Sequence, residues 1–517
     1  MPYEARSTGN GFVVDDGSDA LGVTSDERTV TVTGSRLNVP ERYVHISDDT
    51  VRVASTIGEL HDSLAAAGIP VEASPYGLSQ MLTHGLVASP DSVYEGVYRI
   101  ASGDQIEATA RNGRIEVDLS HHFEWCYSKS RQDQAPDTAR FMSLLADATD
   151  RQVRAAGGQG VLCLSSGKDS VAVAVALAQS GNTQVPCVTY IAHEQDTEYL
   201  YARDLCERLG LEHHTATMPD DPRIVRDLVT RLFEQGSAPT TDLSIIPSML
   251  LAQQAGFDSG AALLDGTGND LYAGWLPGRQ DRLKRQLRIR NRTLMRAIRS
   301  RLPLDSRWNY LTRSALGTQL TLRLFRQEDL PRFYPDAVDV DDRYFELSEP
   351  EDDIFEWYCN VVTRVDDTSR TIPKVLLTAE AAGLTGAMPF LDEQVAEYWF
   401  NLPETDRVDR TTWGKKLFLK KALKDAIGYD DAAVGTGYFD FDGQRFLLDH
   451  ADFVRDEVLG CALWGNEIEP LFNEWMDALP DRKMLYHSLH ALFIVSGWHN
   501  HSRHLSHNAP RSSEASP

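Results

Sequence analysis

The chain has 517 residues, of which 42% are hydrophobic and 25% are charged, as is typical of a soluble globular protein with more than one domain. Its formal net charge of −25 disfavours a nucleic-acid-binding scaffold, because phosphate binding needs a basic face. The sequence contains no stretch of about 18 or more apolar residues, and its start, MPYEARSTGNGF, lacks the pattern of a secretory signal. We therefore expect a cytoplasmic protein that binds neither nucleic acid nor membranes.

Short strands separated by turn residues are predicted between residues 40 and 120, and the helical pattern TIGELHDSLAAAG interrupts them. The Asn-Gly pair between Arg111 and Arg114 is typical of a two-residue hairpin turn. These patterns predict an N-terminal α+β unit. The polar stretch from Tyr127 to Arg140 has no periodicity and predicts a linker.

Strand and helix patterns alternate after the linker, which predicts an α/β fold with a doubly wound parallel sheet. The apolar runs are GVLCL, QVPCVTYIA, EHHTATM and AALLDGTG, and the last of them closes the series. After Leu271 the pattern is almost wholly helical, and the final residues, HNAPRSSEASP, are predicted to form a disordered tail.

The first apolar run ends in the loop Ser165-Ser166-Gly167-Lys168-Asp169-Ser170, directly before a helical pattern. Backbone N–H groups at such a loop and helix start bind phosphate. Gly167 allows a close approach, the three serines add hydroxyl donors, and Lys168 can reach a phosphate oxygen. Asp169 would repel phosphate unless a divalent cation lies between them. The loop is not a Walker A motif, because Asp169 stands where that motif has Ser or Thr.

A second loop, LLDGTGNDLYAGW, follows the last apolar run and places Asp265 and Asp270 around Gly266 and Gly268. Loops at the carboxyl ends of parallel strands converge on one crevice. We therefore predict that Asp169 and Asp270 are Mg²⁺ ligands. For either loop alone, a glycine-rich turn without a ligand is an equally good interpretation.

These loops carry a resemblance to a known family. The first resembles the S-G-G-x-D-S motif of N-type ATP pyrophosphatases, with Ser166 in place of the first glycine. Between Tyr43 and Tyr438, further segments resemble the asparagine synthetase superfamily: MLTHGLVASPDSVYEGVYRIASGD, YIAHEQDTEYLYARDLCERLGLEHH, TTDLSIIPSMLLAQQA, DGTGNDLYAGW and GLTGAMPFLDEQVAEYWFNLP.

The resemblance implies a degenerate class II glutaminase-like domain over residues 1–126, a linker over 127–140, an ATP pyrophosphatase domain over 141–505 and a tail over 506–517. It implies ATP and Mg²⁺ as cofactors. A carboxylate of a small molecule or peptide would be adenylated, pyrophosphate would leave, and an amine would attack. By family position, the residues expected to bind the nucleotide outside the first loop are Leu164, Ile191, Asp265, Gly266 and Gly268.

Several departures from the family pattern bear on the reaction. Glutamine-hydrolysing members use a cysteine directly after the initiator Met, where this chain has Pro2, so we expect no glutamine hydrolysis. In lacking the glutaminase cysteine, the chain is similar to β-lactam synthetases, carbapenam synthetases and lasso-peptide cyclases. This similarity implies cyclisation or amidation in natural-product or peptide biosynthesis. Thr385 replaces a family glutamate, and no lysine stands near Gly435.

The candidate catalytic residues are therefore Lys168, Thr385 and Lys374, the last of which falls at a family lysine position. Lys415 and Lys416 are further substitutes for the missing lysine. For Lys374, Lys415 and Lys416, a solvated helix position is the alternative interpretation.

Other functions stay open at this point. Lys168 is also typical of sulfur-transferring or RNA-modifying pyrophosphatases, although the six cysteines include no C-x-x-C pair. The loss of the family glutamate and lysine fits a catalytically impaired scaffold. The basic segment Arg279–Arg301 is either a solvated helix face or a docking surface for an acidic peptide. His213 and His214 are expected to be structural rather than metal ligands.

Overall fold

The computed structural model describes residues 3–7, 12–15, 22–35, 37, 39, 41–121, 134–191, 197–254, 260–273, 276, 297–298, 324–340, 362–434, 441–482 and 485–506. Apart from residues 297 and 298, the basic segment Arg279–Arg301 lies outside the described residues, as do Gly435 and residues 507–517.

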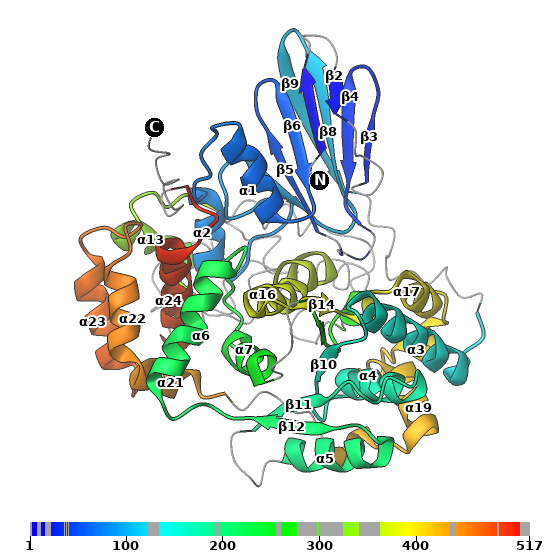
Figure 1. Ribbon diagram of the computed structural model, residues 1–517. Helices are drawn as coiled ribbons and strands as arrows, with labels where there is room; N and C mark the ends of the chain where they lie inside the picture. Colours follow the sequence, from blue (N-terminus) through cyan, green and yellow to red (C-terminus); the bar gives the residue numbers. More distant parts are fainter. Residues whose placement is uncertain are drawn as a thin grey trace, which may run out of the picture.

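The N-terminal unit is a pair of antiparallel sheets, drawn in blue at the top of Figure 1. One sheet has the strand order β2-β1-β6-β5-β7 and the other β3-β4-β8-β9. Their bounds are β1 Tyr3–Ser7, β2 Phe12–Asp15, β3 Val23–Ser25, β4 Thr29–Thr33, β5 Arg42–Ile46, β6 Thr50–Ala54, β7 Val97–Ile100, β8 Asp104–Arg111 and β9 Arg114–His121. Alternate residues of β4 and β8 are buried, so valine, isoleucine and alanine side chains form one shared core.

The predicted hairpin is confirmed. Arg111 pairs with Arg114, and the two turn residues, Asn112 and Gly113, have φ angles of 51° and 77°, which the tight turn requires. The strands before residue 40 were not predicted, although the Val-Thr alternation of β4 is a strand signal.

Part of the N-terminal unit packs against the end of the chain and forms a second hydrophobic core with it. The helices α1 (Ile57–Ala66) and α2 (Pro75–His84) begin after the capping residues Thr56 and Ser74. α2 contacts the C-terminal helix α24 (Leu485–His501). Ser506 exchanges two hydrogen bonds with Val71, of 2.6 and 2.9 Å. Ser506, the first residue of the predicted tail, is thus hydrogen-bonded to the N-terminal unit.

The central sheet is parallel, with the strand order β12-β11-β10-β13-β14. Its strands are β10 Gly160–Cys163, β11 Cys187–Tyr190, β12 His213–Ala216, β13 Ala262–Leu264 and β14 Thr385–Ala387. This confirms the predicted doubly wound α/β fold. After Leu271, where an almost wholly helical pattern is predicted, β14 was not predicted, because its three residues carry no strand pattern and form a strand by pairing with β13.

Helices cover both faces of the parallel sheet (Figure 1). α4 (Lys168–Gln179) and α5 (Thr197–Leu209) lie on one face, backed by α3 (Thr138–Ala155), which starts inside the predicted linker. The other face is covered by α7 (Ile245–Gln254) and α16 (Ile372–Ala382), with α6 (Pro222–Gln235) beside them. The strand order reverses beside β10, which places the crevice between the loops after β10 and β13.

The remaining described helices extend this framework. They are α8 Asp270–Ala273, α13 Leu330–Phe333, the π-helix η2 Val362–Thr371, the 3₁₀-helix η3 Pro389–Leu391, α17 Glu393–Phe400, α18 Glu404–Arg407, α19 Leu417–Ile427, α20 Asp431–Val434, α21 Gly443–Asp449, α22 Ala451–Leu459 and α23 Ile468–Ala478. Among the helices in the described part of the chain, none has the length and apolarity needed to cross a bilayer.

Candidate functional site

Hydrogen bonds made by its own serines fix the conformation of the loop after β10. The Ser170 hydroxyl accepts the Ser165 N–H at 3.1 Å and lies 3.0 Å from the Ser165 hydroxyl, which in turn accepts the Gly167 N–H at 3.1 Å. Gly167 is the N-cap of α4, and no side chain caps that helix start. The first-turn N–H groups of α4 therefore face the cleft without a capping side chain, which suits them to bind an anion.

Gly266 brings the two loops into backbone contact. A Cβ atom at this position would lie 2.5 Å from the Ser170 nitrogen and 2.6 Å from the Asp169 carbonyl carbon. Only glycine fits such an approach. The Asp265 carboxylate accepts the Thr267 N–H at 2.8 Å, which fixes the second loop, and Gly268 has a φ of 114°.

Two carboxylates and one ammonium group meet where the loops touch. The Lys416 Nζ lies 2.8 Å from the Asp169 Oδ2 and 2.9 Å from the Asp270 Oδ1. The Asn269 amide donates to the other Asp169 oxygen at 2.6 Å. The Lys416 side chain is 4% exposed to solvent, whereas the side chains of Asp169 and Asp270 are 30% and 29% exposed. The lysine is thus buried behind two carboxylates that face the cleft.

The charges in this cluster stabilise one another. Burial would raise the pKa of Asp169, but the Lys416 ammonium and the hydrogen bond from Asn269 lower this pKa. Their combined effect outweighs that of burial, so the net shift is downward. Burial would likewise lower the pKa of Lys416, and the two carboxylates raise it. The charged forms of Asp169 and Lys416 are therefore both favoured. Lys416, one of the lysines offered as substitutes by the sequence, thus contacts both predicted metal ligands.

Asp169 and Asp270 fit a Mg²⁺ ion that is also bound by phosphate oxygens. Mg²⁺ usually takes one or two protein carboxylates and completes its shell with water and substrate phosphates. Among the described residues, no group of three or more His, Cys, Asp or Glu side chains gathers as a metal site. The pair is consequently suited to a metal that arrives with a nucleotide.

The cleft around this cluster has a cavity volume of about 280 Å³ and is open to solvent. Most of the nucleotide-binding candidates line it. They are Leu164, Ser165, Gly167, Lys168, Asp169, Ser170, Asp265, Gly266, Gly268 and Asp270, and the candidate catalytic Lys374 lines it as well. Lys168 adds a cation and lies 3.8 Å from Asp431 of α20.

Three candidates lie elsewhere. Ser166 is buried behind the loop, where its hydroxyl donates to Glu198 at 3.2 Å and its carbonyl accepts from Tyr429. Ile191 follows β11 and lines an adjoining cavity, which shares Tyr190 with the cleft. Thr385 is exposed at the amino end of β14 and is not among the described residues that line the cleft. Its position gives no support to a catalytic role.

Lys374 belongs to a second charged group in the cleft. Its ammonium donates to the Ser244 hydroxyl at 3.3 Å, and Ser244 donates to Asp242 at 2.6 Å. Burial would raise the pKa of Asp242, but Lys374 and Arg370 lower it. Lys374 is thus a held side chain rather than a solvated one.

Sequence reasoning missed two cleft residues of η2, Asp367 and Thr371. They stand four residues apart, and Lys374 follows three residues later. This spacing marks one helix face, and that signal could have identified them.

His213, expected to have a structural role, packs within the fold. His213 bonds the Thr189 hydroxyl at 2.9 Å and stacks on Tyr199, which is a structural role. The described cysteines, Cys163, Cys187, Cys206 and Cys461, are free thiols.

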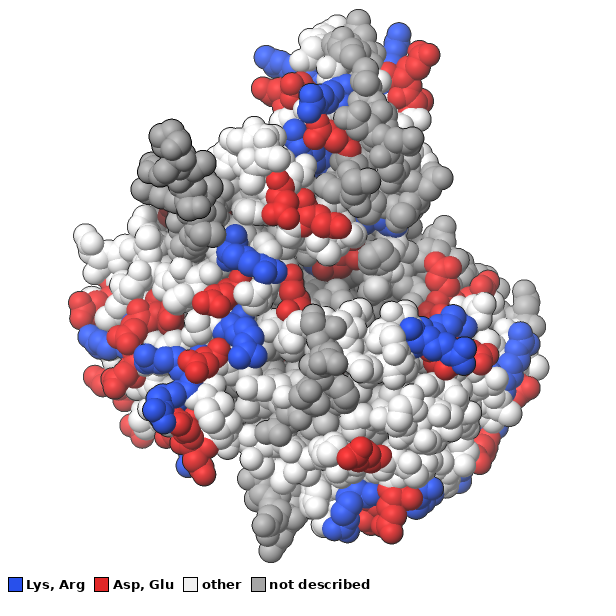
Figure 2. All heavy atoms as spheres, in the orientation of Figure 1, with Lys and Arg blue, Asp and Glu red and all other residues white. Residues whose placement is uncertain are grey.

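Figure 2 shows acidic and basic side chains interspersed on the face that it presents.

The geometry agrees with the comparisons with known proteins. A protein-family model described as asparagine synthase matches residues 140–428. This range includes the parallel sheet, both loops and Lys416. No curated protein matches the chain.

Proposed function

Because the chain belongs to the asparagine synthase family, whose members are ATP-dependent ligases that form C–N bonds, we propose that it adenylates a carboxylate with ATP and joins the product to an amine. The observation that carries this proposal is the Asp169–Lys416–Asp270 cluster at the carboxyl ends of β10 and β13. It joins metal-binding carboxylates to a phosphate-binding loop in one cleft.

In this mechanism the chain binds and orients the triphosphate. The first-turn N–H groups of α4 bind the β- and γ-phosphates, while Lys168 adds a positive charge beside them. When bound by Asp169 and Asp270, Mg²⁺ would neutralise charge on the departing pyrophosphate. Leu164 and Gly266 line the part of the cleft left for the nucleoside.

The acyl-adenylate forms when a carboxylate oxygen attacks the α-phosphorus, which breaks the bond to pyrophosphate. The amine then attacks the acyl carbon, AMP leaves, and the amine loses a proton. Lys374, which lines the cleft and donates to Ser244 at 3.3 Å, is the residue we propose to contact the adenylate. The adjoining cavity around Ile191, which shares Tyr190 with the cleft, offers room for the rest of the substrate.

The amine is proposed to come with the substrate or as free ammonia rather than from glutamine. None of the six cysteines lies within residues 1–125, so the two antiparallel sheets of the N-terminal unit contain no thiol to serve as a nucleophile. Intramolecular cyclisation or amidation, as in β-lactam synthetases and lasso-peptide cyclases, is the reaction we propose.

The proposal is tested by identifying the products formed from ATP. Purified protein is mixed with Mg²⁺, ATP and a panel of amino acids and dicarboxylic acids, and exchange of labelled pyrophosphate into ATP is measured. We expect exchange that depends on one class of acid, with AMP as the nucleotide product. Release of ADP and phosphate would contradict the mechanism. Failure of the protein to bind Mg²⁺-ATP in a calorimetric titration would favour the scaffold alternative.

A further inference from the structure

One wall of the nucleotide cleft is also the wall of a second cavity. The wall is formed by η2 and the start of α16. Asp367, Thr371 and Lys374 line the nucleotide cleft. Ser369 and Pro373 stand on the same segment but line the second cavity, together with Leu376 and Leu377. Within each set the residues follow the spacing i, i+4, i+7, which places them on one helix face. The two sets lie on opposite faces of the segment.

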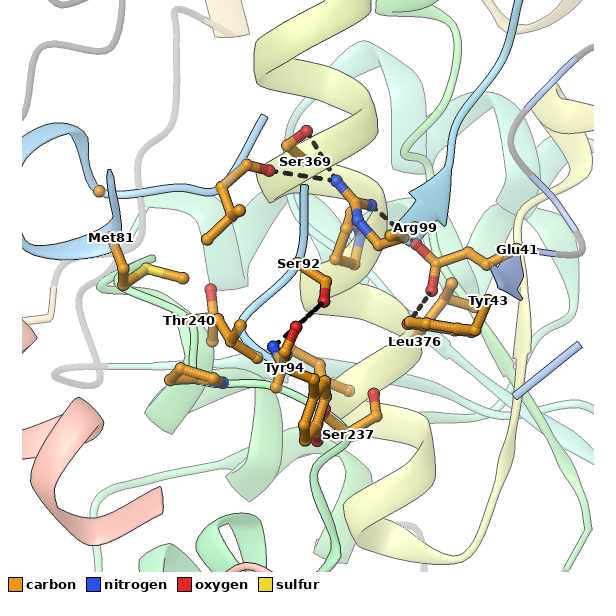
Figure 3. Close-up of a pocket in the computed structure, with 17 residues that line it drawn as sticks. Glu41, Tyr43, Met81, Ser92, Tyr94, Arg99, Ser237, Thr240, Ser369 and Leu376 are labelled. Atoms are coloured by element: carbon orange, nitrogen blue, oxygen red, sulfur yellow. Dashed lines mark hydrogen bonds and ion pairs between the residues drawn. The ribbon is translucent and has the colours of Figure 1, made fainter. Parts of the chain in front are cut away.

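This second cavity, which we call the interface cavity, has a volume of about 50 Å³. Its other walls come from the N-terminal unit, including Tyr43 and Arg99, and from the segment that precedes α7, including Ser237 and Thr240. Figure 3 shows these side chains around the cavity, with Arg99 beside Ser369. The N-terminal unit therefore contacts the back of the segment that forms the nucleotide cleft.

Arg99 makes that contact through hydrogen bonds from both of its terminal nitrogens. Nη1 donates to the Thr368 carbonyl at 2.7 Å and to Glu41 at 2.9 Å, and Nη2 donates to the Ser369 hydroxyl at 2.7 Å and to the Val87 carbonyl at 3.3 Å. Figure 3 shows the bonds to Glu41 and Ser369. Arg99 is 8% exposed. A planar guanidinium held by four acceptors has little freedom to rotate.

The bonded segment has an unusual backbone. η2 is a π-helix, a form that is rare and frequently found at functional sites. The Arg99 bonds to Thr368 and Ser369 fall between Asp367 and Thr371, two residues of η2 that line the cleft. A change in this bond pair would therefore change where those two side chains point.

We propose that Arg99 is a positioning residue of the nucleotide cleft. It belongs to β7 of the N-terminal unit and fixes η2, so that Asp367, Thr371 and Lys374 lie against the bound nucleotide. The N-terminal unit thus supports ATP binding although it supplies no thiol for glutamine hydrolysis. This inference rests on the proposed function only in taking the cleft to bind ATP.

The test measures Mg²⁺-ATP affinity of the full chain by calorimetry, well below the unfolding temperature of each variant. Arg99→Met removes all four bonds and Ser369→Ala removes one of them from the other side. Arg99→Lys keeps the charge with a single donor group. The matched control is Arg111→Met, which removes the same charge from the same unit at a side chain that is 65% exposed.

We expect Arg99→Met to weaken Mg²⁺-ATP binding about tenfold and Ser369→Ala about threefold. Arg99→Lys should recover part of the loss, and Arg111→Met should bind as the wild type does. The Arg99→Met, Ser369→Ala double variant should bind no more weakly than Arg99→Met alone, because both changes break the same contact.

The inference is overturned if Arg99→Met lowers the unfolding temperature but leaves the affinity for Mg²⁺-ATP unchanged. Should Arg99→Met not fold, Ser369→Ala and Arg99→Lys decide the question, and wild-type affinity in both would overturn it. If the wild type itself does not bind Mg²⁺-ATP, the proposed function fails. If it binds and the variants bind equally well, only the role of Arg99 fails.

Discussion

Replacing Lys416 by Met tests two things: how much its ammonium group stabilises the fold, and whether that group competes with Mg²⁺ for Asp169 and Asp270. Met keeps the length of the side chain and removes the charge, so the Asp169 and Asp270 carboxylates lose the ammonium that lies 2.8 and 2.9 Å from them. Removing one partner of a buried ion pair typically costs about 3–5 kcal/mol. Because each carboxylate keeps about 30% of its exposure and water can hydrate it, we expect a loss of about 2–3 kcal/mol.

Mg²⁺ should compensate for part of this loss. Without Lys416, the two carboxylates form a divalent-cation site with no competing ammonium, and a ligand at ten times its dissociation constant stabilises a fold by about 1.4 kcal/mol. Mg²⁺ should therefore stabilise Lys416→Met more than it stabilises the wild type.

The assay is urea unfolding of both proteins in EDTA and in millimolar Mg²⁺, followed by circular dichroism. Lys421→Met is the control, because it breaks an exposed i,i+4 pair with Asp425 on the same helix and should change stability by at most about 0.5 kcal/mol. The reasoning is refuted if Lys416→Met unfolds at the wild-type urea concentration, or if Mg²⁺ stabilises both proteins equally.

Three further predictions follow from the site and the core. Asp270→Asn should lower the rate of pyrophosphate exchange about 100-fold by loss of a metal ligand, and an unchanged rate would argue against the predicted metal site. Gly266→Ala should abolish Mg²⁺-ATP binding, measured by calorimetry, because the new Cβ would lie 2.5 Å from the Ser170 nitrogen; retained binding would show that the two loops can separate. Burial lowers the pKa of His490 and of His504 from 6.5 to about 4, so the unfolded chain takes up protons before the folded one and stability should fall from about pH 6.5 to pH 4, by about 2 kcal/mol per histidine at pH 5. Urea unfolding of His490→Gln at pH 5 and 7 should show a smaller difference than in the wild type, and an equal difference would contradict this assignment.

Much of the site could be predicted from local sequence patterns. The loops Ser165–Ser170 and Asp265–Asp270 directly follow apolar runs, so their glycines and carboxylates could be placed at strand ends without knowledge of the fold. The β8–β9 hairpin and helix α1 are local in the same sense. Each depends on a turn dipeptide or a periodicity contained within a dozen or so residues.

The tertiary structure decided which distant residues complete the site. Nothing near Lys416 in the sequence distinguishes it from Lys415 or from a solvated lysine, and its partner Asp169 is 247 residues away. β14 becomes a strand only beside β13, and Arg99 meets Ser369 across 270 residues. Thr385, chosen by family position, lies away from the cleft. The physical reason is that charge pairing and close approach depend on which elements pack together, whereas hydrophobic periodicity records only which face of each element is buried.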